Sequence, residues 1–220
     1  GPDDNLYVSV GDAELLVVPP QDNVPLGIRG SIFRLTPDGA IPEDTDNPWS
    51  PVYAFGFRNP YGMAFHPENG TLFVTDNGPD CCDRIVRVEP GQFHGWPLYG
   101  DHPQDLILLK SDPTTVRGID PAVVHGIYDT GWAHIGPTQL IFYDGERYGD
   151  EFRGNLFYGT FGTKAIHRVV LSNNERDVVK EEIVWESKQP IIGLTGTDDG
   201  YIYFVTTTEV FRIDGFHGQD

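Results

Sequence analysis

The sequence predicts an all-β protein, a β-propeller built from four-stranded antiparallel blades. Two observations predict this fold. Short apolar runs with the two-residue period of strands recur along the chain, and 26 Gly and 18 Pro among 220 residues supply frequent turns. No segment sustains the 3.6-residue period of a helix, so we expect little helix. A single propeller domain over residues 1–220 fits a chain of this length.

A two-strand pattern occurs four times in the sequence. The first strand of each copy is a short run that follows an acidic or glycine-containing turn: Leu6–Val8, Leu72–Val74, Leu156–Tyr158 and Ile202–Phe204. The second strand carries an arginine at the same place in each copy: Ile32–Leu35, Ile85–Val88, Ile166–Val169 and Val210–Ile213. Apolar residues alternate with other residues in these runs, which predicts antiparallel hairpins.

Further strands are expected on both sides of these hairpins. Runs that precede a hairpin are Gly62–Phe65, Thr138–Phe142 and Ile191–Leu194, and runs that follow one are Val52–Phe55, Ala122–Val124 and Glu182–Trp185. The resulting blades cover roughly residues 1–56, 57–125, 134–187 and 188–215.

The strand count predicts an incomplete ring. The first blade lacks its innermost strand and the last lacks its outermost, so we expect four consecutive blades of a larger ring. The remaining blades of a longer protein, or another chain, would complete it. The alternative is a four-bladed ring that closes by other means. The chain also starts inside a sheet, at Leu6–Val10, as the middle of a longer protein would.

Charge and hydropathy exclude several functions. The chain has 15 Lys+Arg against 33 Asp+Glu, a formal net charge of −18. Such a surface repels nucleic acids and anionic membranes, so we expect no nucleic-acid partner. The longest apolar runs are about five residues, whereas a bilayer span needs about 20. We therefore expect no membrane span.

Most of the unusual residues fall between Gly56 and Pro97. In a propeller, Arg58 and Asn59 would lie on the connection between two blades, at the same end of the ring as the loop Asn77–Pro79. A guanidinium and an amide suit an anionic or carbonyl-rich ligand, and the backbone carbonyls of a Gly-Pro turn suit a hard cation. The alternative is that these residues only form turns.

The same segments resemble a known family, the soluble pyrroloquinoline-quinone (PQQ) dependent glucose/sorbosone dehydrogenases. The matching pieces are Leu6–Asp12, Gly30–Pro42, Gly56–Phe65, Asn77–Pro79 with Asp83, and Gly95–Pro97. The match is specific over residues 1–97 and diffuse beyond them. It implies a six-bladed ring of which this chain covers about four blades, PQQ and Ca²⁺ as cofactors, and a sugar or small alcohol as substrate.

The resemblance also implies roles for individual residues. Arg58 and Asn59 correspond to a pair that contacts cofactor and substrate, and Asp12 to the acid that partners the catalytic histidine. We therefore expect Asp12 and Arg58 to be catalytic. Gly78 and Pro79 correspond to the turn whose carbonyls bind Ca²⁺, and Asp83 to one of two acids after that turn.

Two further residues are candidates for cofactor binding. His134 lies on a loop expected at the same end of the ring, although a histidine beside Trp132 is also a common structural feature. Lys164 lies two residues from the position of a family lysine.

The sequence departs from the family pattern at several positions. Arg84 replaces the second acid, His94 replaces an aromatic residue, and the apolar Pro190–Ile192 occupies the place of basic residues. The family's catalytic histidine lies just upstream of Leu6–Asp12, and the chain begins too late to contain it.

Three functions follow from these observations. The resemblance implies that the chain is part of a quinoprotein dehydrogenase that oxidises sugars or related alcohols, with an extracellular or periplasmic location. Alternatively, it is a non-catalytic binding module of the same fold, or a structural unit of an extracellular assembly.

Cys81 and Cys82 are adjacent and are the two cysteines of the chain. They pair with each other in a vicinal disulfide, stay reduced, or link to another molecule. A vicinal disulfide closes an eight-membered ring and constrains the peptide between the two cysteines. This loop follows Gly78-Pro79, so such a ring would lie close to the candidate ligand site.

Overall fold

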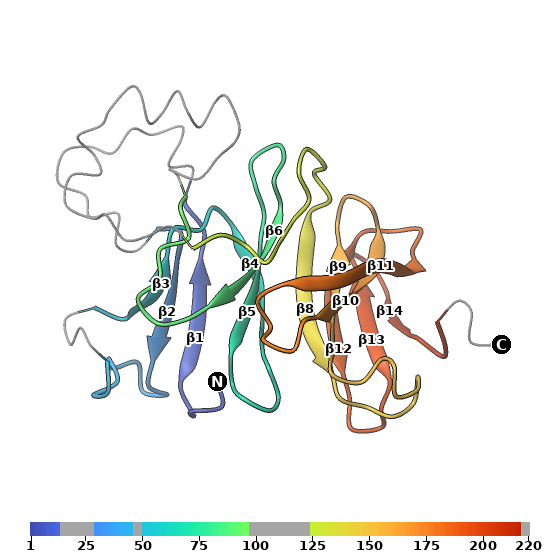
Figure 1. The fold of residues 1–220 in the computed structure, drawn as a ribbon, viewed down its shortest axis with the longest axis horizontal. Helices are drawn as coiled ribbons and strands as arrows, with labels where there is room; N and C mark the ends of the chain where they lie inside the picture. The colour runs from blue at the N-terminus through green and yellow to red at the C-terminus, as the bar shows by residue number, and fades with distance from the viewer. Residues whose placement is uncertain (14–28, 46–49, 97–123, 217–220) are drawn as a thin grey trace. The chain divides into compact units, whose positions relative to one another are not determined.

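The structure, a computed structural model, describes residues 1–13, 29–45, 50–96 and 124–216. All regular structure in these residues is β-strand, and the strands form antiparallel sheets (Figure 1). The all-β prediction is confirmed. Within the same residues, no helix has the length and apolar character needed to cross a membrane.

The chain divides into two compact units. The first comprises Gly1–Pro60 and Val88–Gly126, and the second comprises Tyr61–Arg87 and Ile127–Asp220. Each unit is described by itself.

The first unit contains a sheet of the order β1-β2-β3, formed by β1 (Leu6–Val10), β2 (Ser31–Leu35) and β3 (Val52–Phe55). The pairing is antiparallel, with Leu6 opposite Leu35 and Ile32 opposite Ala54. Ile32 and Ala54 are fully buried. The three strands agree with the predicted hairpin and the run that follows it.

A segment that the strand pattern did not reveal lies beside β3. Phe93 forms an isolated parallel bridge with Phe55. The amides of Gly91 and His94 donate to the carbonyls of Tyr53 and Phe55 across 2.7 and 2.8 Å. These bonds extend the sheet beyond β3 and bring residues 94–96 to its end.

The second unit contains three sheets. Their orders are β4-β5-β6-β7, β11-β10-β9-β8 and β12-β13-β14. The strands are β4 (Pro60–Phe65), β5 (Leu72–Asp76), β6 (Arg84–Val88), β7 (Tyr128–Asp129), β8 (Pro137–Tyr143), β9 (Asn155–Thr160), β10 (Ala165–Leu171), β11 (Val178–Glu186), β12 (Ile191–Gly196), β13 (Ile202–Thr206) and β14 (Val210–Arg212).

The fourth strand of the second sheet differs from the prediction. Among the described residues it is β7, Tyr128–Asp129, whereas residues 122 and 123 of the expected run Ala122–Val124 lie outside the described residues. Tyr128 and Asp129 pair with Ile85 and Arg84 of β6. Backbone pairing with β6 therefore makes Tyr128–Asp129 a strand, although these residues show no alternation of apolar side chains.

Neighbouring sheets of the second unit contact one another through β4 and β5, β8 and β12. The hydroxyl of Thr75 donates to the carbonyl of Thr138 across 2.7 Å, and the hydroxyl of Thr138 donates to the carbonyl of Ile191 across 3.0 Å. An added Cβ on Gly62 of β4 would lie 2.4 Å from the Thr138 carbonyl oxygen. Consecutive sheets thus meet along β4, β8 and β12, as blades of a propeller do.

Apolar side chains fill the space between these sheets. One cluster joins the second and third sheets through Phe73, Leu140 and Tyr158, and another joins the third and fourth through Phe157, Ile191 and Phe204. The strand ends and loops are therefore held on a packed core.

Candidate functional site

Asp12, at the end of β1, is held by two contacts in the first unit. Its amide donates to the carbonyl of Arg58 across 2.8 Å. The indole Nε1–H of Trp96 donates to its carboxylate oxygen Oδ2 across 3.0 Å. Asp12 is 9% exposed. The indole therefore orients the Asp12 carboxylate.

Arg58 and Asn59 closely follow β3 and lie against Gly11. An added Cβ on Gly11 would lie 3.5 Å from Asn59 Oδ1 and 3.6 Å from the Arg58 carbonyl oxygen. Arg58 and Asn59 are both half-buried. The structure therefore brings Asp12, Arg58 and Asn59, predicted from separate segments, into one group. Their roles as catalytic and cofactor-binding residues stay predictions.

Trp96 and His94 complete this group and were not selected as site residues from the sequence. His94 is fully buried, its ring lies 4.7 Å from the Phe57 ring, and its Nδ1 lies 3.1 Å from the Val124 carbonyl oxygen. The Gly-Trp motif was the one available signal for Trp96. Pro97, which follows it, lies outside the described residues.

The loop between β5 and β6, in the second unit, contains Gly78, Pro79 and Asp83. Asp83 is fully buried. Its Oδ1 accepts a hydrogen bond from the Gly78 amide at 2.9 Å, and its Oδ2 accepts from the amides of Ile135 and Gly136, each at 2.8 Å. The carboxylate thus connects its own loop to the segment that precedes β8.

Arg84, which stands where the family has a second acid, is bound within the hairpin. Its Nη2 lies 2.7 Å from Asp76 Oδ2 and its Nε donates to the same oxygen across 3.0 Å. Both side chains are 3% exposed. The two charges therefore face each other across β5 and β6.

Cys81 and Cys82 form a disulfide with each other in this loop, with sulfur atoms 2.10 Å apart. Cys81 is buried and Cys82 is half-buried with a φ of 64°. The Cys82 amide donates to the Gly131 carbonyl across 2.8 Å.

His134 and Lys164 lie near the same end of β8 and β9. His134 is 48% exposed, and its Nδ1 lies 3.5 Å from Asp83 Oδ1. Lys164 is exposed in the turn between β9 and β10 with a φ of 57°. That turn is tied to the His134 segment because the Gly162 amide donates to the Ile135 carbonyl across 2.9 Å. Cofactor binding by either side chain stays a prediction.

The buried acidic side chains in and beside the loop between β5 and β6 already accept hydrogen bonds from the protein. Both oxygens of Asp83 accept backbone hydrogen bonds, and Asp76 is paired with Arg84. The described part of the chain contains no group of three or more His, Cys, Asp or Glu side chains that could hold a metal ion. The buried acidic side chains in and beside this loop are therefore engaged within the protein, and Ca²⁺ binding by the Gly78 and Pro79 carbonyls and by Asp83 stays a prediction.

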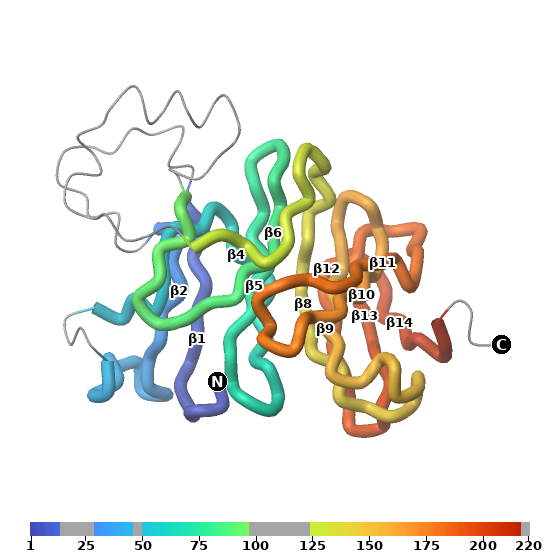
Figure 2. Tube along the Cα trace, viewed as in Figure 1, coloured from blue at the N-terminus to red at the C-terminus, as the bar shows by residue number. Residues whose placement is uncertain are grey.

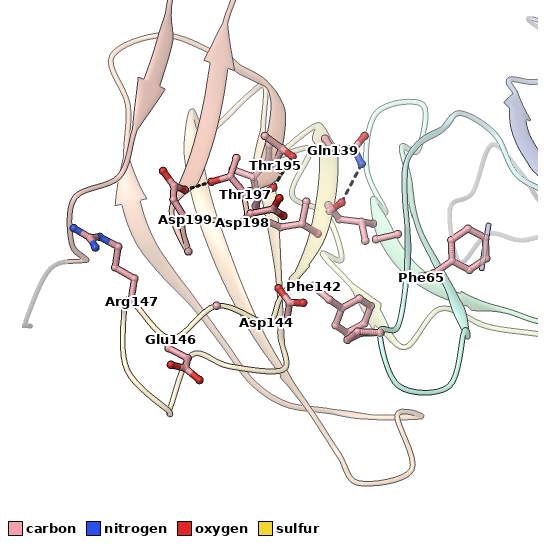
Figure 3. Close-up of a pocket in the computed structure, with 18 of the residues that line it drawn as sticks. Phe65, Gln139, Phe142, Asp144, Glu146, Arg147, Thr195, Thr197, Asp198 and Asp199 are labelled. Carbon is pink, nitrogen blue, oxygen red and sulfur yellow. Dashed lines mark hydrogen bonds between the residues drawn. The ribbon is translucent and has the colours of Figure 1, made fainter. Parts of the chain in front are cut away.

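An open cleft of about 980 Å³ lies in the second unit. It is lined by the C-terminal parts of β4, β8 and β12 and by the loops that follow β8 and β12 (Figure 3). Asp144, Glu146, Asp198 and Asp199 are exposed there. None of the site residues predicted from the sequence lines this cleft. Asp83 contacts the segment at the opposite, N-terminal end of β8.

A family comparison covers most of the chain. Residues 1–213 match the model of the glucose/sorbosone dehydrogenase family. The aldose sugar dehydrogenase YliI of Escherichia coli (strain K12) is 27% identical over 190 residues, which are 81% of this chain and 48% of that protein. The chain spans about half the length of the curated relatives it matches.

Solved structures show the same fold. An oxidoreductase (glucose dehydrogenase) from Thermus thermophilus has a TM-score of 0.71 at 26% identity, covering 94% of this chain and 57% of that one. The PQQ-bound aldose sugar dehydrogenase of Streptomyces coelicolor has a TM-score of 0.71 at 20% identity, covering 94% and 54%. The predicted propeller fold is confirmed by these likenesses.

Proposed function

The chain belongs to the glucose/sorbosone dehydrogenase family, and from this premise we propose that it is part of a PQQ-dependent dehydrogenase that oxidises sugars or related alcohols. The observation that carries the proposal is the group formed by Asp12, Arg58, Asn59 and Trp96 in the first unit. Bound PQQ would supply the quinone that accepts a hydride.

The side chains of this group suit a polyanionic quinone. The Arg58 guanidinium offers several N–H donors in a planar fork, which matches a carboxylate or adjacent quinone oxygens. The Asn59 amide offers both a donor and an acceptor. Half-burial of both residues leaves them reachable by a ligand while limiting their contact with water.

Asp12 acts as an acceptor in this proposal. Trp96 fixes the orientation of its carboxylate, so the carboxylate can orient a proton-carrying group such as the imidazole of the family's catalytic histidine. The role of Asp12 is therefore to position a base and to stabilise its protonated form.

The proposal is tested by equilibrium dialysis of the purified protein against PQQ, with and without Ca²⁺. Arg58→Ala should weaken PQQ binding by about 1.5–3 kcal/mol, the usual loss for a hydrogen bond to a charged group. Arg153→Ala is the control, because Arg153 is an exposed arginine whose ion pair with Glu146 spans 3.5 Å. Equal affinity in the two variants would rule out this group as the PQQ site.

A second function is favoured by the loop between β5 and β6. Asp83 and Asp76 both accept hydrogen bonds from protein donors, so both acids serve structural contacts within the second unit. A binding module that keeps the family fold without catalysis agrees with this arrangement. Sugar-dependent reduction of a redox dye distinguishes the two functions: turnover supports the dehydrogenase, and PQQ or sugar binding without turnover supports the module.

A further inference from the structure

The Cys81–Cys82 disulfide lies at the contact between two loops of the second unit. The loop between β5 and β6 runs beside the segment 130–136 that leads into β8 (Figure 2). The Cys82 amide donates to the Gly131 carbonyl across 2.8 Å, and the Thr130 amide donates to the Asp83 carbonyl across 2.9 Å. Two backbone hydrogen bonds thus connect the residues at and directly after the disulfide ring to this segment.

The Asp83 side chain adds a second connection. Its Oδ2 accepts the amides of Ile135 and Gly136, and its Oδ1 accepts the amide of Gly78 in its own loop. Since Asp83 is the next residue after the ring, its position depends on the path that the chain takes through Cys81 and Cys82. Segment 130–136 is therefore held at both ends by residues 82–83.

The backbone of this loop is closely packed at the disulfide. An added Cβ on Gly78 would lie 1.7 Å from the Cys81 carbonyl oxygen, so the two backbones are in direct contact. Cys82 has a φ of 64°, a conformation that non-glycine residues adopt at a cost and keep only where the surroundings hold them. The covalent ring is one such restraint, and opening it removes that restraint from the residue whose amide binds Gly131.

Segment 130–136 carries exposed side chains at this end of the unit. Trp132 is 72% exposed and the His134 side chain is 48% exposed. The segment is also bonded to the turn after β9, because the Phe161 amide donates to the Gly136 carbonyl across 2.7 Å. A change at the ring is therefore passed to His134, Trp132 and the adjoining turn.

We propose that the Cys81–Cys82 disulfide is a redox latch: closed, it holds segment 130–136 in place, and reduction by a dithiol releases that segment. The thiolate of the dithiol attacks the half-buried Cys82 Sγ, the S–S bond breaks, and Cys81 leaves as a thiolate that takes a proton. The second thiol of the reductant then attacks the mixed disulfide and releases Cys82. Two electrons pass to the protein, and the reductant leaves as its own disulfide.

The reduced latch is also a site for a trivalent arsenical. Two adjacent thiols can each form one As–S bond to phenylarsine oxide, with loss of one water molecule, whereas the disulfide cannot. Phenylarsine oxide therefore serves as the probe for the open state.

The test measures amide hydrogen exchange of the whole chain, oxidised and after treatment with a dithiol. The amides of Cys82, Ile135 and Gly136 should exchange about ten-fold faster or more in the reduced protein, while amides within β9 and β10 stay unchanged. Phenylarsine oxide should add to the reduced protein in a one-to-one ratio and not to the oxidised protein.

A variant and a control complete the experiment. The double variant C81S/C82S should exchange like the reduced protein whether or not dithiol is present. In the natural sequence, equal exchange rates before and after reduction, with two free thiols demonstrated by arsenical binding, would overturn the proposal. A disulfide that resists dithiol in the folded protein would overturn it as well. Neither readout uses PQQ or sugar, so failure here is separable from failure of the proposed dehydrogenase function.

Discussion

Trp96 and Asp12 are 84 residues apart in sequence, and the indole of Trp96 donates a 3.0 Å hydrogen bond to the Asp12 carboxylate. The contact depends on the backbone bonds that place segment 91–96 beside β3, ending with the Trp96 amide donating to the Gly56 carbonyl across 2.9 Å. It therefore ties the end of β1 to the far side of the same sheet. Both side chains are mostly buried, so the bond is shielded from water.

Replacing this donor should destabilise the first unit. Trp96→Phe keeps an aromatic ring but removes the N–H, which should lower the free energy of unfolding by about 1.5–3 kcal/mol, as for other hydrogen bonds to charged groups. Urea unfolding followed by far-UV circular dichroism measures the loss. Trp132→Phe is the control, because Trp132 is 72% exposed and should change stability by less than about 0.5 kcal/mol. Equal stability of the two variants would mean that the indole bond contributes nothing.

Asp83 should contribute more to stability than any exposed acid. Asp83→Ala leaves the amides of Gly78, Ile135 and Gly136 without their acceptor inside the protein. Burial of unpaired donors costs about 1–3 kcal/mol each, so the variant should lose about 3 kcal/mol or more. The matched control is Asp80→Ala in the same loop, where the aspartate is exposed. Thermal unfolding of both variants measures the difference, and a loss below that of the control would contradict the prediction.

Most strands could be predicted from the sequence because their apolar residues alternate. The runs Leu6–Val10 and Val52–Phe55 coincide with β1 and β3. β7 could not be predicted, because Tyr128 and Asp129 form a strand through backbone pairing with β6 and show no alternation of apolar and polar residues. The segment 91–96 was not predicted for the same reason: an isolated bridge of Phe93, its ring contact with Phe55 and several amide–carbonyl bonds connect it to β3, and none of these has a sequence pattern.

The candidate site was only partly accessible to sequence reasoning. Residue types identified Arg58 and Asn59, the family resemblance identified Asp12, and the fold brings the three together. The sequence identifies Asp83 as an acid beside the Gly78-Pro79 turn. It does not show which groups the carboxylate contacts, and in this structure these are three backbone amides. The partner of Arg84 likewise depends on strand pairing, which sets Asp76 opposite it.

Close approach of β4 and β8 should make Gly62 intolerant of a side chain. A Cβ there would lie 2.4 Å from the Thr138 carbonyl oxygen and 2.9 Å from the Leu140 amide nitrogen, both in the backbone. Gly62→Ala should therefore cost about 1–3 kcal/mol through displacement of one strand. Gly196→Ala on β12 is the control, because the nearest atom to its added Cβ is 4.0 Å away. If the two variants had the same denaturant midpoint, β4 and β8 would accommodate the added methyl group at Gly62 without loss of stability.

A partly buried acid on β11 links stability to pH. Glu181 contacts His167 of β10 and accepts a hydrogen bond from the Tyr158 hydroxyl across 3.3 Å. The hydrogen bond with His167 lowers the pKa of Glu181 below its ordinary value of 4.5. Because the folded protein binds this proton less tightly than the unfolded chain, ionised Glu181 stabilises the fold above pH 4.5. That stabilisation disappears as the pH falls through the lowered pKa.

Glu181→Gln should therefore reduce the pH dependence of unfolding in acid. The free energy of unfolding of the natural sequence should fall more steeply than that of the variant as the pH drops from about 5 to about 3, and the two curves should converge at the acid end. Chemical denaturation at several pH values measures both curves. Glu146→Gln is the matched control, because the Glu146 side chain is 82% exposed and its removal should leave the slope nearly unchanged. Parallel curves for the natural sequence and Glu181→Gln would show that the His167 contact does not couple this carboxylate to folding.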